Sequence, residues 1–276
     1  MHSRDEKLAA LGRVIDTLDI LRVKCPWDAK QTNESLRPNT IEETYELAQA
    51  LLGGNDDEIR KELGDVLLHI LFYAKIGSEK KAFDIADVAD ALNEKLIYRH
   101  PHIFGDVSVK DSHDVETNWE ALKLKEKGGN RTVLAGVPEA LPALVKAYRV
   151  QQKAANVGFD WNNPADVWGK VREEMGEVQT EIESVADVAL HSEDKEAKEQ
   201  ARKRLEAEFG DLLFAVINAA RKYKVNPENA LELTNRKFIR RFNYIEEQAM
   251  RQGRHPNDMT LDEMDALWDE AKQHKL

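Results

Sequence analysis

The sequence has little of three things: cysteine, long apolar runs and positive charge. Its single cysteine, Cys25, can form no disulfide within the chain, so nothing indicates an oxidising compartment. The longest apolar run, residues 66–74, is interrupted by His69 and is far shorter than the ~20 residues that span a bilayer. The first 24 residues are charged throughout and contain no apolar core of a signal peptide. We therefore expect a cytoplasmic protein that contacts no membrane.

The shortage of positive charge excludes one large class of partner. The 276 residues include 40 Lys and Arg against 51 Asp and Glu, which gives a net charge of −11. A protein that binds duplex nucleic acid needs a basic surface to displace the counterions of the phosphates, and this balance argues against it. An acidic chain can still bind a phosphorylated small molecule if a few cationic side chains converge on it and a metal ion bridges the negative charges.

Strand-like alternation is almost absent, and apolar residues recur at helical steps instead. Leu8, Leu11, Ile15, Leu18 and Leu21 follow one another at intervals of three and four. Helix stops are expected at Gly53–Asn55, Gly77, His100–Pro101, Gly128–Asn130, Asn162–Pro164 and Asn226–Pro227. The pattern predicts an all-α fold.

Four short blocks occur twice along the chain, in the same order. They are residues 42–46 and 173–177, 62–68 and 208–214, 93–99 and 235–241, and 119–120 and 268–269. Four matches in one order indicate a tandem duplication of one helical unit. The Gly-rich stretch between them, residues 128–138, is typical of a linker, so we predict domains at 1–127 and 139–276.

Each half carries two pairs of acids at i, i+3 spacing, one pair on each of two successive predicted helices. The pairs are Glu43/Glu46 with Glu62/Asp65, and Glu174/Glu177 with Glu208/Asp211. Residues three apart share a helix face, so two antiparallel helices would bring four carboxylates into one cluster. Such a cluster repels itself unless cations neutralise it, and its oxygen ligands suit Mg²⁺, with Mn²⁺ as a substitute.

Three other interpretations of the acids are weaker. Acids that only solvate a helix face would not be followed by apolar runs, as Asp65 and Asp211 are, because an unpartnered acid at a buried edge is costly. A di-iron bundle needs Glu-x-x-His, but His69 comes four residues after Asp65 and the second half has Ala215 at that place. An HD-type phosphohydrolase would use His113–Asp114, which lies in a polar stretch.

The motifs E-E-x-x-E, E-x-G-D before an apolar run, and N-x-K-x-x-x-R together resemble the MazG family of nucleoside triphosphate pyrophosphohydrolases. The stretches C-P-W-D at 25–28, R-H-P-H at 99–102 and N-V-G-F-D-W at 156–161 are similar to that family too. The likeness covers nearly the whole chain. It implies an all-α fold, Mg²⁺ dependence, dimerisation, and hydrolysis of NTPs and dNTPs to monophosphates and pyrophosphate.

The resemblance also implies roles for individual residues. By similarity, the metal ligands are Glu174, Glu177, Glu208 and Asp211, and the nucleotide contacts are Lys170, Arg204, Lys237, Arg240, Arg241 and Trp268. Independently of the resemblance, the spacing of Lys237, Arg240 and Arg241 lets one helix face present two or three cations to a triphosphate. Trp268 either stacks on a base or anchors a packed helix. Glu173 shares a face with the metal-binding acids and is a candidate for orienting the water that attacks the α-phosphorus.

The two halves differ in ways that bear on activity. Lys170 and Arg240 of the second half correspond to Asn39 and Tyr98 of the first, so the second half has two extra cations for a triphosphate. Its segment between the acid pairs is longer and charged, and forms either a lid or longer helices. We expect the second half to carry most of the catalysis and the first mainly to support dimerisation.

Two alternatives to a broad-specificity enzyme stay open. One is a hydrolase restricted to a pyrimidine nucleotide such as dUTP or dCTP. The other is a regulatory protein that senses nucleotides with little turnover. In each case, the duplicated hairpins and the apolar helix after Asp65 predict a homodimer in which hairpins of two chains complete four-helix bundles.

Overall fold

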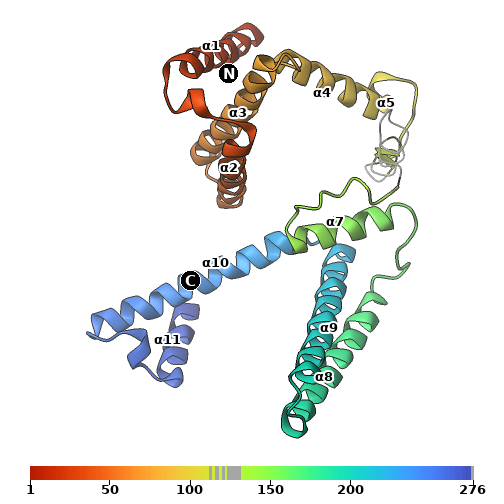
Figure 1. Ribbon diagram of the computed structural model, residues 1–276, viewed down its shortest axis with the longest axis vertical. Helices are drawn as coiled ribbons and strands as arrows, with labels where there is room; N and C mark the ends of the chain where they lie inside the picture. The colour runs from red at the N-terminus through yellow and green to blue at the C-terminus, as the bar shows by residue number, and fades with distance from the viewer. Residues whose placement is uncertain (112–113, 116–117, 120–121, 123–131, 275–276) are drawn as a thin grey trace. The chain divides into compact units, whose positions relative to one another are not determined.

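The computed structural model describes residues 1–111, 114–115, 118–119, 122 and 132–274 (Figure 1). Within these ranges the chain forms ten α-helices and two short 3₁₀ helices, without a strand. The prediction of an all-α fold is therefore confirmed. In the same ranges, no helix combines the length and the apolar character that crossing a bilayer requires.

The contacts divide the chain into two compact units, Met1–Val109 and Lys110–Leu276. The predicted linker, residues 128–138, lies partly outside the described ranges, and its described part, 132–138, consists of turns. His113 also lies outside the described residues. The predicted domain boundaries therefore stay predictions.

The first unit is built on a hairpin of two long helices. Its elements are α1 (Arg4–Lys24), η1 (Asp28–Lys30), α2 (Asn33–Gly53), α3 (Asp56–Glu79), α4 (Ile85–Arg99) and α5 (Pro101–Phe104). The turn between α2 and α3 follows the sequence: Gly54 takes the left-handed conformation with φ 71°, and the side chain of Asn55 caps the start of α3. This tight turn makes α2 and α3 pack side by side over much of their length.

Large apolar side chains fill the core of the first unit. Leu18 of α1, Leu36 of α2, and Leu71, Phe72 and Ile76 of α3 are each at most 5% exposed. They join three helices in one cluster, so α1 covers one side of the α2–α3 hairpin.

The second unit repeats this hairpin with longer helices. Its elements are α7 (Ala143–Ala155), α8 (Val167–His191), α9 (Lys195–Lys222), α10 (Pro227–Arg251), η2 (Pro256–Asp258) and α11 (Leu261–Gln273). The charged segment between the acid pairs was expected to form either a lid or longer helices. It forms longer helices, the last part of α8 and the first part of α9. The start of α10 agrees with the sequence signal, because Asn226 caps it and Pro227 occupies its first turn.

Small side chains form the core of the second hairpin. Val167 and Val171 of α8 pack on Ala215 and Ala219 of α9, with Leu212 against them. Their small volume contrasts with the leucine and phenylalanine of the first unit. The duplicated hairpins therefore share a backbone plan but differ in how completely side chains fill the space beside the two helices.

One expected helix stop is wrong. Gly77 does not end a helix, because α3 continues through it to Glu79. The glycine is buried, and a Cβ built there would lie 2.8 Å from the ring of Phe83 and 2.9 Å from its backbone oxygen. Gly77 is therefore a site of close approach between α3 and the segment that leads into α4.

Replacing Gly77 with alanine should lower the free energy of unfolding by about 1–3 kcal/mol, because the new methyl group overlaps Phe83. Gly64 offers a matched control in the same helix, since a Cβ there meets nothing within 4 Å. Gly64→Ala should instead stabilise the protein by about 0.5–1 kcal/mol through helix propensity. Urea unfolding followed by circular dichroism measures both, and equal effects of the two substitutions would contradict the packing argument.

Candidate functional site

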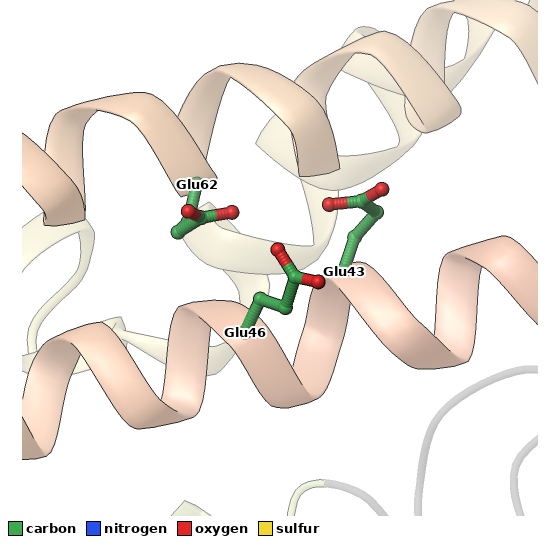
Figure 2. Close-up of side chains that lie close together, drawn as sticks. All are labelled: Glu43, Glu46 and Glu62. Carbon is green, nitrogen blue, oxygen red and sulfur yellow. The ribbon is translucent and has the colours of Figure 1, made fainter.

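The first unit brings three of its four predicted acids into one cluster. Glu43 and Glu46 project from α2 and Glu62 from α3, and Figure 2 shows their carboxylates converging between the two helices. One oxygen of each lies within 4.8 Å of the others. Asp65, one turn after Glu62, is close enough for its charge to raise the pKa of Glu43.

The charges in this cluster are incompletely balanced. Glu62 is buried, and its Oε1 lies 2.8 Å from Nζ of Lys61, but its Oε2 is buried without a hydrogen-bond partner in the described part of the chain. Burial, followed by the charges of Asp65, Glu46 and Glu62, raises the pKa of Glu43. An unsatisfied carboxylate oxygen among like charges is the environment that a bound cation relieves.

The second unit forms the equivalent cluster between α8 and α9. Oxygens of Glu174, Glu208 and Asp211 lie within 4.8 Å of one another, and Glu174 is buried. Glu177 lies beside them: its hydrogen bond with Glu174, together with the negative charges of Glu174 and Glu208, raises the pKa of Glu177. All four acids that the spacing singled out therefore lie together.

A lysine distinguishes the second cluster from the first. Nζ of Lys170 lies 2.5 Å from Oε1 of Glu174 and 3.0 Å from Oε1 of Glu173. These contacts raise the pKa of Lys170, and the hydrogen bond from Lys170 holds the pKa of Glu174 below its usual value despite burial. The first unit has Asn39 at this position, which cannot supply the charge.

An arginine lies at the other end of the second cluster. Arg204 is one helical turn before Glu208, and its guanidinium donates hydrogen bonds to Glu181 at 3.1 Å and to Ser184 at 3.2 Å. The first unit has Glu58, an acid, at the corresponding position. Cations thus flank the second cluster on both sides along the hairpin.

The remaining predicted nucleotide contacts form a separate group on α10 and α11. Lys237 and Arg240 are exposed on α10. The guanidinium carbon of Arg241 lies 5.4 Å from the centre of the Trp268 ring, and the ring of Phe238 lies 5.1 Å from it. The structure therefore places Trp268 as a packed side chain that joins α11 to α10, and its role toward a base stays a prediction.

A cavity beside the second cluster was not predicted from the sequence. It has a volume of about 450 Å³, and Lys170, Glu174 and Asp211 line it together with mainly apolar and aromatic side chains. Aligning the two repeats could have revealed the cavity. Where the first unit has the large side chains of His69 and Phe72, the second has the smaller Ala215 and Asn218.

An ion-pair network holds residues 156–161 in place, and two of these residues line the cavity. Asp160 accepts hydrogen bonds from Arg221 at 2.6 and 3.2 Å and from Lys222 at 3.0 Å. Burial raises the pKa of Asp160, but these hydrogen bonds outweigh it and leave the pKa below its usual value. The network ties residues 156–161 to the end of α9, which holds the aromatic residues Phe159 and Trp161 at the cavity.

Both clusters are suited to a divalent cation. Each offers several carboxylate oxygens close together, and hard oxygen ligands of this kind bind Mg²⁺, Mn²⁺ or Ca²⁺. In the first cluster a buried oxygen has no partner among the described residues, and in the second a lysine ammonium partly neutralises the acids. The acids of each hairpin can therefore hold a metal ion.

Known proteins resemble this chain over both hairpins. Residues 31–104 and 164–245, which include both hairpins, match the family described as MazG nucleotide pyrophosphohydrolase domain. The chain is 43% identical over 249 residues to the nucleoside triphosphate pyrophosphohydrolase/pyrophosphatase MazG of Thermotoga maritima, covering 90% of this chain and 89% of that protein. It is 38% identical over 255 residues to the nucleoside triphosphate pyrophosphohydrolase of Escherichia coli K12, covering 91% and 92%.

A third relative is longer than this chain. The Bacillus subtilis protein YabN is 48% identical over 250 residues, which are 90% of this chain but 48% of YabN. The matches to the shorter relatives extend across nearly all of both chains and include both carboxylate clusters. The chain belongs to the MazG family of nucleotide pyrophosphohydrolases.

Proposed function

We propose that the chain hydrolyses nucleoside triphosphates and their deoxy forms to monophosphates and pyrophosphate at the second carboxylate cluster. The observation that carries the proposal is the close set of Glu174, Glu208 and Asp211 with Lys170 against it. Family membership and the names of the relatives support the reaction class. Carboxylates that hold a metal, next to cations that bind phosphate, are the parts that phosphoryl chemistry requires.

The ion we assign to the cluster is Mg²⁺, with Mn²⁺ as a substitute. Glu174, Glu208 and Asp211, with Glu177 beside them, would hold it through their carboxylate oxygens. When bound, the metal lowers the pKa of water and neutralises charge on the phosphate oxygens. The same donor set in the first unit, Glu43, Glu46, Glu62 and Asp65, is proposed as a second ion site.

The residues around the cluster have different roles in the proposed reaction. A water oxygen forms a bond to the α-phosphorus, the bond from that phosphorus to the bridging oxygen breaks, and pyrophosphate leaves with the bond electrons. Glu173 is exposed next to the cluster, where its carboxylate can orient the water and accept its proton. Lys170 and Arg204 are placed to balance the charge that moves onto the leaving group.

The cations of α10 have a supporting role in the proposal. Lys237 and Arg240 are exposed on one helix with Arg241, so the three can contact the outer phosphates of a bound triphosphate. Trp268 is packed on Phe238 and lies under Arg241, which fits a side chain that holds this arginine in position. The cytoplasm, where these substrates occur, is the compartment we assign to the protein.

Pyrophosphate release from ATP, GTP, CTP, UTP and the corresponding dNTPs tests the function. We expect turnover of all of them in Mg²⁺ and none after chelation with EDTA, because the carboxylates cannot bind the triphosphate without a cation. Turnover of one pyrimidine nucleotide alone would favour the narrow hydrolase. Nucleotide binding without turnover would favour the sensor and contradict the enzyme.

The second unit is proposed as the site of most catalysis. Its cluster has Lys170 and Arg204 where the first has Asn39 and Glu58. A hydrogen bond that involves a charged group contributes about 1.5–3 kcal/mol, and each ~1.4 kcal/mol is a factor of ten in affinity. Because it lacks these cations, the first cluster should bind a triphosphate about a hundredfold more weakly.

Two matched variants separate the clusters. Glu177→Gln should reduce the rate of pyrophosphate release by roughly 100-fold or more, because an amide in place of the carboxylate weakens the binding of the metal ion. Glu46→Gln, at the corresponding position of the first unit, should keep the rate close to that of the wild type. Circular dichroism is the control that checks whether both variants fold. If Glu46→Gln were inactive and Glu177→Gln fully active, the halves would be assigned the wrong way round.

A homodimer is the assembly that we propose. Apolar side chains stay exposed on the hairpins: Leu63 on α3, and Met175, Leu213 and Val216 on α8 and α9, are between 44% and 61% exposed. Exposed apolar side chains on a packed hairpin can form the face that another chain covers. A second chain could cover it by adding two helices to each hairpin, which would complete a four-helix bundle.

Light scattering coupled to gel filtration should therefore give twice the 31.5 kDa mass of the chain at micromolar concentration. Leu213→Glu should shift the mass toward one chain, because it places a charge in the apolar surface. Leu190→Glu is the control, since Leu190 is 79% exposed near the end of α8. A fully active wild-type monomer would contradict the proposed assembly.

A further inference from the structure

The long hairpin of the second unit carries an ion pair one helical turn beyond its acids. Glu181 follows Glu177 by four residues on α8, and Arg204 precedes Glu208 by four residues on α9. Residues four apart share a helix face, so both side chains continue the faces that carry the acids. Oε2 of Glu181 accepts a hydrogen bond from Nε of Arg204 at 3.1 Å, which joins the two helices at the edge of the cluster.

A serine gives the guanidinium of Arg204 a second contact. Nη2 of Arg204 donates a hydrogen bond to Oγ of Ser184 at 3.2 Å. Ser184 lies three residues after Glu181 on the same face of α8, so the two acceptors together contact the edge of the guanidinium formed by Nε and Nη2. Because the guanidinium is rigid and planar, two contacts on one edge fix its orientation as well as its position.

The opposite edge of this guanidinium can still donate hydrogen bonds. Arginine has five N–H donors, and only one on Nε and one on Nη2 are used by Glu181 and Ser184. Within the described ranges, no acceptor contacts Nη1, and the side chain of Arg204 is 51% exposed. The edge formed by Nη1 and Nη2 matches the spacing of two phosphate oxygens. Arg204 is therefore held on one edge and accessible on the other.

This group of side chains belongs to the second unit alone. When the acid pairs of the two repeats are aligned, the residues of the first unit that correspond to Glu181, Ser184 and Arg204 are Ala50, Gly53 and Glu58. The helix α2 ends at Gly53, so the first hairpin turns where the second continues. The longer helices of the second unit thus supply both residues that hold Arg204.

We propose that Glu181 and Ser184 are positioning residues, which hold the guanidinium of Arg204 ready for the phosphates of a bound triphosphate; the inference rests on the proposed function. A long, exposed side chain loses rotamer freedom when a ligand fixes it, and this loss weakens binding. An arginine that the protein already orders loses less. The two residues therefore raise the affinity for phosphate without touching the substrate.

Two other roles for Glu181 make different predictions. Its carboxylate could compete with phosphate for Arg204, but it accepts from Nε, whereas a phosphate would accept from the Nη1–Nη2 edge. The pair could also serve only to join α8 to α9. In that case, the effect of removing Glu181 on phosphate affinity would not require the side chain of Arg204.

Calorimetric titration with tripolyphosphate in Ca²⁺ measures the affinity for phosphate directly. We expect Glu181→Ala to weaken binding about fivefold and Ser184→Ala about twofold, because Arg204 must then be ordered by the ligand. Glu181→Gln keeps an oxygen acceptor for Nε and should stay within about twofold of the wild type. Glu183→Ala removes an exposed carboxylate from the same helix and is the matched control, with no expected change.

A double-mutant cycle shows whether Glu181 acts through Arg204. Glu181→Ala should add no further loss of tripolyphosphate affinity to Arg204→Ala, because the side chain that it positions is already gone. Additive losses would indicate a structural role and overturn the proposal. Unchanged or tighter binding by Glu181→Ala and Ser184→Ala would overturn it as well, and so would a wild type that does not bind tripolyphosphate. Thermal unfolding followed by circular dichroism is the control for folding.

An activity assay on the same variants separates this inference from the proposed function. If the wild type released no pyrophosphate from ATP in Mg²⁺, the proposed function would fail, but the calorimetric cycle would still decide whether Glu181 positions Arg204. In an active wild type, Glu181→Ala should lower kcat/KM for ATP about fivefold. The same substitution should leave kcat/KM unchanged in Arg204→Ala, and a further fivefold loss there would contradict the inference while the enzyme function stands.

Discussion

The mutual repulsion of carboxylates held between two antiparallel helices is the constraint around which both units are built. Two like charges about 4 Å apart repel by about 4 kcal/mol near a protein surface. Each hairpin nevertheless brings acids from both of its helices within 4.8 Å. The first unit leaves an oxygen of Glu62 unsatisfied among the described residues, and the second sets Lys170 against Glu174. Both arrangements leave oxygen ligands that could hold a cation.

The two hairpins share the cluster of acids but differ in the side chains next to it. In the first unit, Leu36, Phe72 and the hydrogen-bonded His69 fill the space next to the acids and join α1 to the hairpin. In the second, Val167 and Ala215 leave a cavity there, at the cost of buried packing. The first copy therefore gains buried packing, whereas the second keeps an open space next to its acids.

The surroundings of the second acid cluster depend on elements that are distant in sequence. Asp160, paired with Arg221 and Lys222, ties the segment before α8 to the end of α9. Through this tie the aromatic residues of that segment reach the same cavity as Lys170 and Asp211. The long α8 and α9 extend beyond the acids and carry Arg204 and Glu181, so the cluster lies between a cation on each side.

The sequence by itself determined the all-helical fold, the repeat and the grouping of the acids. Helical spacing alone places Glu174 and Glu177 on one face and Glu208 and Asp211 on another, and a short connection brings these faces together. The caps at Gly54 and Asn226 follow from local backbone chemistry, and so were predictable. These features depend on residues within a few positions of one another.

Only the tertiary structure decided the features that depend on volume and on long-range contacts. Gly77 does not end its helix, because the ring of Phe83 packs on it and the helical hydrogen bonds continue. The cavity next to the second cluster is bounded by α7, which packs on α9 although the two helices are far apart in the sequence. A cavity is the space that side chains from several elements fail to fill, so no local pattern in the sequence encodes it.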